Sequence, residues 1–418
     1  MTFSSALAEA LALDVLERFQ RYVRVATQSD ASAESSPSTP GQLELGRLLV
    51  DELHAAGLGD ASLDEQGFVF ATLPGSGPVV GLLAHVDTSP DARGDGVEPL
   101  VHASYDGGIL SLPRGGTVLD PADMPVLAGK VGHDIVTGSG DTLLGADDKA
   151  GVAEIMAAVA HLAAHPELPR PTLRVGFTPD EEIGKGAFRF DLERFGAQCA
   201  YTLDGSQPGE LQDETFSARD VILTVHGVDI HPGWATGKMV NALTVAARIV
   251  AALPTDRLTP DTTSGREGFI HVTDVRGTAP RAVIQAIVRD FEEDLLEQHL
   301  ELLRRTAAEV IASVPGARLE VEVRYQYSNM RRYLEAFPEV VAAAARAIAA
   351  EGLTVICTPI RGGTDGSILS ERGLPTPNIF TGGHEYHSVR EWASVQDMAS
   401  AAAVIVRLTG EWAVVGSA

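Results

Sequence analysis

Two adjacent carboxylates, Asp147 and Asp148, precede a segment whose composition and apolar spacing predict a helix from about Val152. One Asp at a helix start suffices to cap free backbone N–H groups, which is the common use of this residue type there. The second carboxylate is available for another task, and the glycines on either side, Gly145 and Gly151, indicate close approach of the backbone to a neighbour. A metal cation is the simplest partner for such a pair.

Other histidines and carboxylates follow predicted buried strands. A nearly continuous apolar run from Pro78 predicts a strand buried on both faces, with polar residues only at its end. In open α/β sheets the carboxyl ends of strands are where ligands bind. A satisfied histidine or a solvated acidic turn is the simpler interpretation of each group taken alone. In chain order the groups are His85 and Asp87, Glu181 and Glu182, Asp204, and His384 and His387.

These side chains supply imidazole and carboxylate ligands without thiolate. That donor set suits zinc in a catalytic role, or manganese or cobalt, better than a structural cysteine site. A divalent cation lowers the pKa of a bound water to roughly 7, which makes hydroxide available at neutral pH. A free Glu nearby could take the proton and later deliver it to a leaving amine. The predicted chemistry is hydrolysis of an amide or ester.

The length of 418 residues favours two domains with a large core. A formal charge of −25 disfavours binding to nucleic acid or to an anionic membrane surface, because the long-range field repels polyanions. No apolar run is long enough to span a bilayer, and the first residues lack the pattern of a signal peptide, so we expect a cytoplasmic protein. Cys199 and Cys357 lie in hydrophobic contexts, which predicts buried thiols.

The pattern of predicted elements is that of an α/β protein with an inserted second domain. Strands and helices alternate up to about residue 214, interrupted by a Gly-, Pro- and Asp-rich surface excursion at 90–141. A βαββαβ order follows, which is typical of a four-stranded antiparallel sheet backed by two helices. The chain then returns to the α/β pattern, with a strand at 354–359 and a final helix from about residue 395. We therefore expect a catalytic domain of residues 1–214 and 327–418, and an inserted lid domain of residues 215–326.

The motifs around these residues closely resemble tripeptide aminopeptidases of the zinc-dependent, aminoacylase/carboxypeptidase-like M20 family. The match extends from about residue 85 to the final helix, and it includes the long excursion. The motifs that carry it are His85-Val-Asp87, Gly145-Ala-Asp-Asp-Lys-Ala-Gly151, Asp180-Glu-Glu-Ile-Gly184, His231-Pro-Gly233, Met239-Val-Asn-Ala242, Arg361-Gly-Gly-Thr-Asp-Gly366, and Thr381-Gly-Gly383 with Tyr386-His387.

This resemblance implies a central mixed sheet in the catalytic domain and two zinc ions per chain, with cobalt or manganese as possible substitutes. Asp147 would bridge both ions, and the peptide bond after it would be cis. Glu181 would be the general base, and Asp87 would orient one histidine ligand. The ligands implied for the two ions are His85 and Asp204 for one, and Glu182 and His387 for the other, in addition to Asp147. His384 lies where relatives need not have histidine.

In the lid, the resemblance places His231 and Asn241 at positions that contact the scissile carbonyl or the substrate backbone. Arg289 and Arg361 match positions able to bind a carboxylate, for which the guanidinium fork is well shaped. The expected substrates are short peptides cleaved after their first residue, and a homodimer through the lid is possible. A dipeptidase, a carboxypeptidase or an N-acyl-amino-acid deacylase of the same family is the alternative. A non-catalytic metal-binding or scaffold protein would need loss of the base or a ligand, and none is missing.

Overall fold

An eight-stranded mixed sheet organises the larger of two units in the computed structural model, which describes residues 3–415. Strands β8, β3, β9 and β16 run parallel, whereas β1, β2 and β10 pair with antiparallel neighbours. The predicted mixed sheet is thus confirmed. Residues 1–2 and 416–418, at the two ends of the predicted catalytic domain, lie outside the described residues. In sheet order the strands are β1 (Ser62–Leu63), β2 (Val69–Leu73), β8 (Thr172–Thr178), β3 (Val79–His85), β9 (Cys199–Gly205), β16 (Asn378–Phe380), β10 (Glu210–Gln212) and β15 (Ile356–Cys357).

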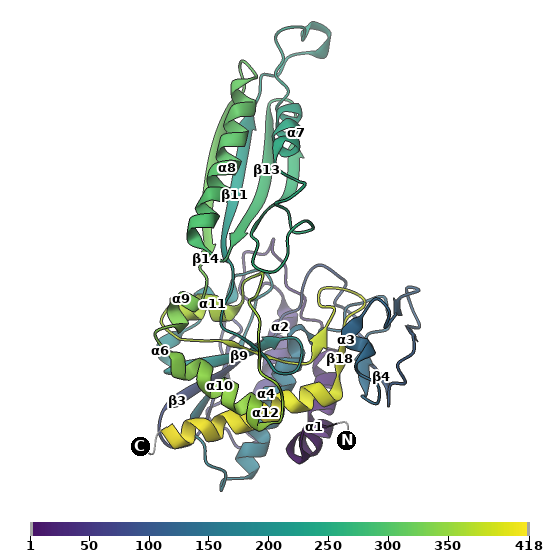
Figure 1. Ribbon diagram of the computed structural model, residues 1–418, viewed down its shortest axis with the longest axis vertical. Helices are drawn as coiled ribbons and strands as arrows, with labels where there is room; N and C mark the ends of the chain where they lie inside the picture. Colours follow the sequence, from purple (N-terminus) through teal and green to yellow (C-terminus); the bar gives the residue numbers. More distant parts are fainter. Residues whose placement is uncertain (1–2, 416–418) are drawn as a thin grey trace. The chain divides into compact units, whose positions relative to one another are not determined.

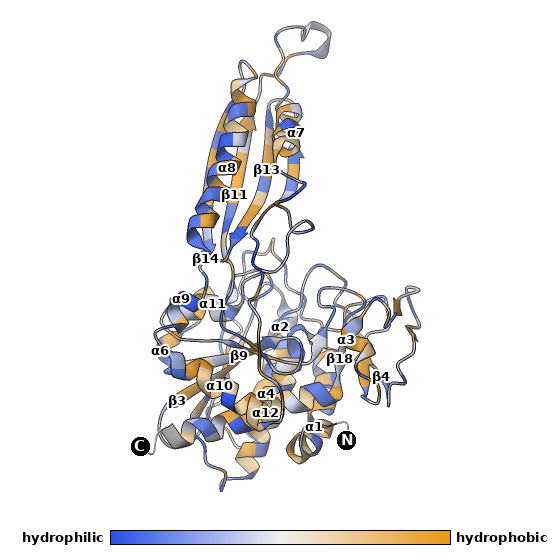
Figure 2. Ribbon diagram, viewed as in Figure 1, coloured by the Kyte–Doolittle hydropathy of each residue, from blue (hydrophilic) through white to orange (hydrophobic). Residues whose placement is uncertain are grey.

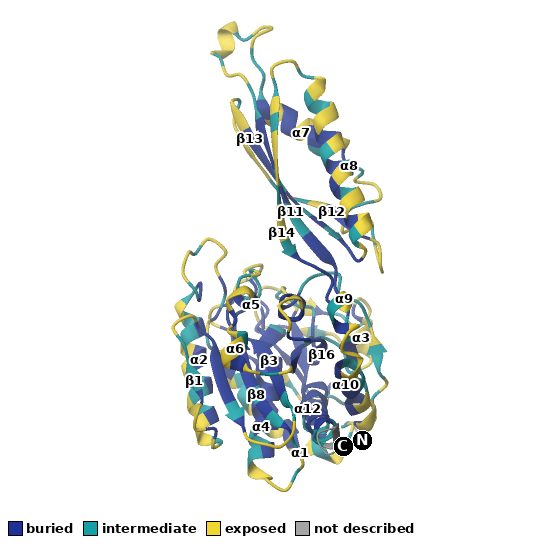
Figure 3. Cartoon of the chain, turned by 90° about the vertical axis from the view of Figure 1, so that its left-hand side faces the viewer, coloured by how far each residue is buried: buried dark blue, intermediate teal, exposed yellow. Residues whose placement is uncertain are grey.

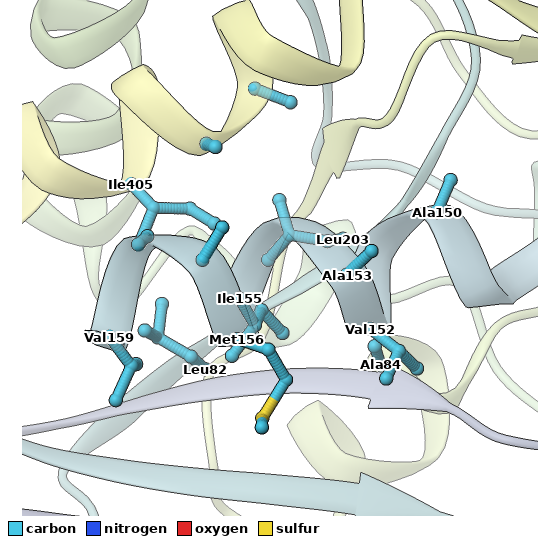
Figure 4. Packing of buried hydrophobic residues seen from close by; sticks show 14 of the residues in the cluster. Leu82, Ala84, Ala150, Val152, Ala153, Ile155, Met156, Val159, Leu203 and Ile405 are labelled. Carbon is cyan, nitrogen blue, oxygen red and sulfur yellow. The ribbon is translucent and has the colours of Figure 1, made fainter. Parts of the chain in front are cut away.

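The helix that begins at the paired carboxylates, α4 (Ala146–Ala164), packs directly on β3 and β9. It is apolar on nearly every side, as expected for a helix buried between a sheet and other helices. Figure 4 shows Ile155 and Met156 of α4 close to Leu82 of β3, and Ile405 on the far side of the helix. The outer layer over α4 consists of α1 (Ala6–Tyr22) and α12 (Val395–Val415), and α10 (Pro338–Ala350) contacts α12 (Figure 1).

The inner strands of this sheet are buried along most of their length, which Figure 3 shows as dark blue on β3, β8 and β16. This agrees with the apolar runs from which they were predicted. Further helices belong to this part of the chain. All are short except α2 (Pro40–Ala55), which contacts β1 and β2 at the edge of the sheet. The short helices here are α5 (Gly186–Arg189), α6 (Leu192–Phe195), α9 (Arg331–Leu334) and α11 (Asp365–Glu371).

The excursion at 90–141 forms a small sheet with residues near the end of the chain. The strand order is β17 (Gly383–His384), β18 (Trp392–Ser394), β7 (Ile135–Thr137) and β4 (Leu100–His102). A hairpin of β5 (Leu110–Ser111) and β6 (Val118–Leu119) and a helix, α3 (Pro125–Ala128), complete it. Because β17 and β18 flank residues 385–391, this sheet fixes both ends of the segment that carries His387.

The second unit comprises Glu214–Arg331 and Pro359–Gly363. Its order is β11 (Ser217–His226), α7 (Ala242–Ala252), β12 (Phe269–Gly277), β13 (Arg281–Asp290), α8 (Glu293–Ala312) and β14 (Arg318–Tyr327), with a short 3-10 helix, η1 (Pro232–Trp234). The predicted βαββαβ order and the four-stranded antiparallel sheet are therefore confirmed. Both helices pack on this sheet, and Figure 2 shows that α8 has an apolar and a polar side, as its one-sided burial requires.

Two expectations about the edge of the main sheet are wrong. The strand predicted at 354–359 is reduced to β15, Ile356–Cys357, which pairs with β10 alone. The thiol of Cys357 is exposed, whereas that of Cys199 is buried as predicted. The cause is position, because an edge strand has a neighbour on one side only. Within residues 3–415, no helix is both long and apolar enough to cross a membrane.

Candidate metal centre

The carboxyl ends of β8, β3 and β9 bring the predicted ligands together. His85 is the last residue of β3, Glu181 and Glu182 follow β8, and Asp204 lies near the end of β9. Because the three strands are parallel neighbours, their ends meet at one edge of the sheet. The start of α4 supplies Asp147 to the same place.

Distances between the side chains define a compact cluster. The Nε2 atom of His85 lies 2.8 Å from Oδ1 of Asp147 and 3.7 Å from Oδ1 of Asp204. The Nε2 atom of His387 lies 3.0 Å from Oε2 of Glu182 and 3.4 Å from Oδ2 of Asp147. Among the carboxylates of this cluster, Asp147 contacts both histidines, with one oxygen toward each.

The two adjacent aspartates at the start of α4 have different partners. Asp148 accepts hydrogen bonds from the backbone N–H groups of His85, at 3.1 Å, and Gly151, at 3.2 Å. It is the capping carboxylate, which leaves Asp147 to face the two imidazoles. The peptide bond between them is cis, as the resemblance implied.

Asp87 contacts three of the other candidate residues. The Nδ1 atom of His85 lies 3.0 Å from the carbonyl oxygen of Asp87 and 3.4 Å from its Oδ1. The Asp87 carboxylate also accepts the backbone N–H groups of Glu181, at 2.9 Å, and Glu182, at 3.2 Å. Sequence reasoning anticipated the contact with the imidazole but not the contact with the backbone of the two glutamates.

The electrostatics of the cluster fit cations. Burial, and then the charge of Asp147, raises the pKa of Glu182 to about 7, and burial raises the pKa of Glu181 well above its usual range. Hydrogen bonds with Asp147 and Glu182 raise the pKa of His387 to about 11. Burial thus makes it costly for Glu181 and Glu182 to be ionised beside the other carboxylates of the cluster. Divalent cations would offset this cost.

Two further observations support this fit. The Oε1 atom of Glu182 is buried without a hydrogen-bond partner among the described residues, which is unusual for a carboxylate and leaves it free to bind a ligand. Two sets of three side chains could each hold a metal ion, because within each set the ligand atoms lie within 4.8 Å of one another. One consists of His85, Asp147 and Glu182, and the other of His85, Asp148 and Asp204. All the donors are nitrogen or carboxylate oxygen, so the set suits zinc, manganese or cobalt.

His384 is not part of this cluster. Its Nδ1 atom lies 2.9 Å from the hydroxyl of Ser206, and its ring packs against that of Trp392. Burial lowers the pKa of His384 to about 3. The side chain is therefore a neutral, buried histidine with a structural partner.

Sequence reasoning missed the residues that hold the segment of the predicted general base. Asp180 is buried, has a left-handed backbone at φ 57°, and immediately precedes Glu181. The side-chain amide of Gln42 makes two hydrogen bonds with Asp180. Its Nε2 donates to Oδ1 of Asp180 at 2.8 Å, and its Oε1 accepts the backbone N–H of Asp180 at 3.1 Å. The backbone N–H of Ser38 adds a bond at 2.9 Å. Gln42 lies in the first turn of α2. From the sequence alone, a buried glutamine at such a position cannot be distinguished from an ordinary surface residue.

Replacing Gln42 with Ala should loosen this segment. The substitution removes one hydrogen bond to the buried Asp180 carboxylate and one from the Asp180 backbone N–H group, so we expect the protein to lose about 2 kcal/mol of unfolding free energy. Displacement of Glu181 by as little as 1 Å would lower kcat by up to about 100-fold. Chemical unfolding and steady-state kinetics measure the two effects, and Gln66→Ala, at an exposed position, is the control. Unchanged kcat in a destabilised Gln42→Ala protein would show that the segment does not depend on this contact.

Within the second unit, His231 and Asn241 have local capping contacts. The His231 ring accepts the N–H of Gly233 at 3.1 Å and lies beside the exposed Trp234. The Oδ1 atom of Asn241 accepts the N–H groups of Leu243 and Thr244 and so caps α7. Both side chains therefore have a structural partner, and the Asn241 amide nitrogen is the atom left for another ligand.

The two arginines differ. Arg361 donates to the carbonyl oxygens of Gly265 and Glu267, at 3.0 and 2.8 Å, and to Thr263, and its guanidinium stacks on two phenylalanine rings. Its donors are thus largely occupied by backbone. The Nε atom of Arg289, by contrast, is buried without a hydrogen-bond partner among the described residues. Of the two arginines, Arg289 therefore has the more available donor for a carboxylate.

Comparison with known proteins identifies the family of this chain. Residues 143–411 match the model of peptidase family M20/M25/M40. The chain is 45% identical over 404 residues to peptidase T of Bacillus subtilis (strain 168), which covers 96% of this chain and 98% of that protein. It is 44% identical over 398 residues to peptidase T of Vibrio parahaemolyticus, which covers 94% of this chain and 97% of that protein.

Two solved structures share the fold. The crystal structure of aminopeptidase PepT from Bacillus cereus superposes with a TM-score of 0.73 at 23% identity, and the match covers 96% of this chain and 99% of that one. A dinuclear metal-binding M20 peptidase from Bacillus subtilis, the YXEP protein, superposes with a TM-score of 0.63 at 16% identity, over 98% and 99% of the two chains. At these identities the likeness establishes the arrangement of elements in space.

Proposed function

Because this chain belongs to peptidase family M20/M25/M40, we propose that it is a metal-dependent aminopeptidase that removes the first residue from tripeptides. It is a hydrolase. Relatives that are about 45% identical to it over nearly the full length of both chains are named peptidase T. The single observation that carries the mechanism is the placement of Asp147 between His85 and His387, with one carboxylate oxygen toward each imidazole.

We assign the ligands of two divalent cations, preferably zinc, to five side chains. Asp147 would bridge the cations, His85 and Asp204 would complete one site, and Glu182 and His387 the other. Cations held there would supply Lewis acidity, which makes water more acidic and a peptide carbonyl more electrophilic. Asp87 bonds the His85 ring through its carbonyl oxygen and the backbone N–H of Glu181 through its carboxylate, so one residue orients a ligand and the base together.

Glu181 acts as general base in this proposal. It takes a proton from water as the water oxygen adds to the first peptide carbonyl, and it delivers that proton to the amine that leaves. Burial raises its pKa, which makes the carboxylate a stronger proton acceptor. His231 would donate to the oxygen that becomes negative, and the amide of Asn241 would bind the substrate backbone.

The substrate assignment is tested by product analysis. Purified enzyme is given an unblocked tripeptide, its N-acetylated form, the matching dipeptide and an N-acyl amino acid. Release of the first residue from the unblocked tripeptide alone supports a tripeptide aminopeptidase. Turnover of the blocked peptide, of the dipeptide or of the acyl amino acid instead would retain the metal chemistry and replace the substrate, as in the alternative assignments.

Arg289 is proposed to bind the C-terminal carboxylate of the tripeptide. Replacing Arg289 with Ala should raise KM for a tripeptide roughly tenfold to hundredfold, the loss expected for a hydrogen bond to a charged group, with a smaller change in kcat. A tripeptide with an amidated C-terminus is the matched control, because it lacks the charge and should be cleaved equally by both proteins. If the variant loses as much on the amide as on the free acid, Arg289 does not bind the carboxylate.

A further inference from the structure

Glu391 is a buried carboxylate that none of the proposed roles uses. Its Oε2 atom accepts the backbone N–H groups of Leu144 and Gly145, both at 2.7 Å, and its Oε1 atom accepts that of Asp147 at 3.0 Å. The side chain is 1% exposed. Three convergent N–H groups around one buried carboxylate are the strong, charge-assisted kind of hydrogen bond, and burial removes the water that would compete for them.

The turn that Glu391 holds is the one that carries the bridging ligand. Gly145 has a left-handed backbone, with φ 82°, and its N–H group and that of Leu144 both donate to Oε2 of Glu391. The third bond is to the N–H group of Asp147 itself. The backbone of the turn is therefore fixed on both sides of the bend, and the Asp147 side chain starts from a defined position.

At its other end Glu391 belongs to the segment of a second ligand, His387, four residues earlier. The N–H of Glu391 bonds to the carbonyl oxygen of Ser388 at 3.3 Å, and the Ser388 hydroxyl donates to the carbonyl oxygen of Glu385. The His387 side chain is 41% exposed, so packing alone does not hold it. Its position depends on the backbone of this tight segment, which ends at Glu391 and continues directly into β18.

We infer that Glu391 is a positioning residue that couples the bridging ligand Asp147 to the ligand His387, which lie 240 residues apart, and so sets the affinity of the centre for its second cation. The inference rests on the proposed metal site. Partners that orient metal ligands, although they do not touch the metal, typically change affinity by about 10- to 100-fold when they are replaced.

The test is metal binding by the full-length, metal-free protein, measured by calorimetric titration with Zn²⁺ and by the visible spectrum of bound Co²⁺. Glu391→Gln keeps the shape but turns an amide N–H toward backbone N–H groups. Glu391→Asp keeps the charge but shortens the reach. In both variants we expect the weaker of two binding steps to lose about 10- to 100-fold in affinity, and the Co²⁺ spectrum to change. A change in spectrum reports ligand geometry, which loss of stability alone does not alter.

Glu385→Gln is the matched control, because Glu385 lies in the same segment but pairs with Arg390 at the surface. Wild-type affinity and spectrum in both Glu391 variants, a loss no larger than that of Glu385→Gln, or failure of both variants to fold would overturn the positioning role. If the wild-type protein itself binds no divalent cation, the proposed metal site fails first. The two failures are therefore distinguishable.

Discussion

Glu181→Gln should reduce kcat by about 10²- to 10⁴-fold while leaving KM and metal content nearly unchanged. The substitution preserves shape but removes the negative charge and the capacity to carry a proton. Glu181 is not one of the five proposed ligands, so the cations should remain bound. Its backbone stays in place, because the Asp87 carboxylate and the Asp180 contacts do not involve the replaced atoms. Steady-state kinetics on a tripeptide, together with metal analysis of the same sample, measure both quantities.

Glu65→Gln makes the same chemical change at an exposed position and should be silent. The two variants together distinguish loss of a proton carrier from loss of charge in an acidic protein. Activity of Glu181→Gln within threefold of wild type would remove Glu181 as the base. Activity lost together with the metal would make it a ligand instead.

Asp147→Asn should abolish binding of one of two cations and lower activity by more than the roughly 10- to 100-fold that an outer-shell change costs. Asp147 is the only one of the five proposed ligands that contacts both histidines. An amide in its place offers one oxygen and carries no charge, so it cannot neutralise two cations. Metal stoichiometry by elemental analysis and kcat/KM on a tripeptide are the measurements.

The neighbouring residue provides the comparison. The carboxylate of Asp148 accepts the backbone N–H groups of His85 and Gly151, so its oxygens are less available to a cation. Asp148→Asn should therefore retain both cations, although it can weaken the start of α4. If Asp148→Asn instead loses a cation while Asp147→Asn keeps two, the assignment of the bridging ligand is reversed. That outcome would favour the cluster of His85, Asp148 and Asp204.

Much of the catalytic unit follows from local patterns. Long apolar runs predicted the inner strands β3, β8 and β9, because a strand buried on both faces has no polar position to interrupt it. The polar residues at their ends then had to meet at one edge of a parallel sheet. That reasoning reached His85 and Asp204, which lie 3.7 Å apart, without any knowledge of the tertiary structure.

Contacts between distant segments were not predictable in this way. Gln42 and Glu391 are polar residues in ordinary local contexts, and only the folded chain brings them to Asp180 and Asp147. The role of Arg361 was equally hidden, because nothing near it in sequence shows that the carbonyl groups around Gly265 occupy its guanidinium. Local periodicity identifies which side chains face a site, whereas the partners of backbone groups depend on loop conformation.

Stepwise addition of Zn²⁺ to the metal-free enzyme, with tripeptide hydrolysis recorded at each step, tests the two-metal centre most directly. The geometry around Asp147 predicts no release of the first residue without metal and a maximum of activity when two equivalents are bound. Full activity in the metal-free protein, or a maximum at one equivalent with no change at the second, would contradict it.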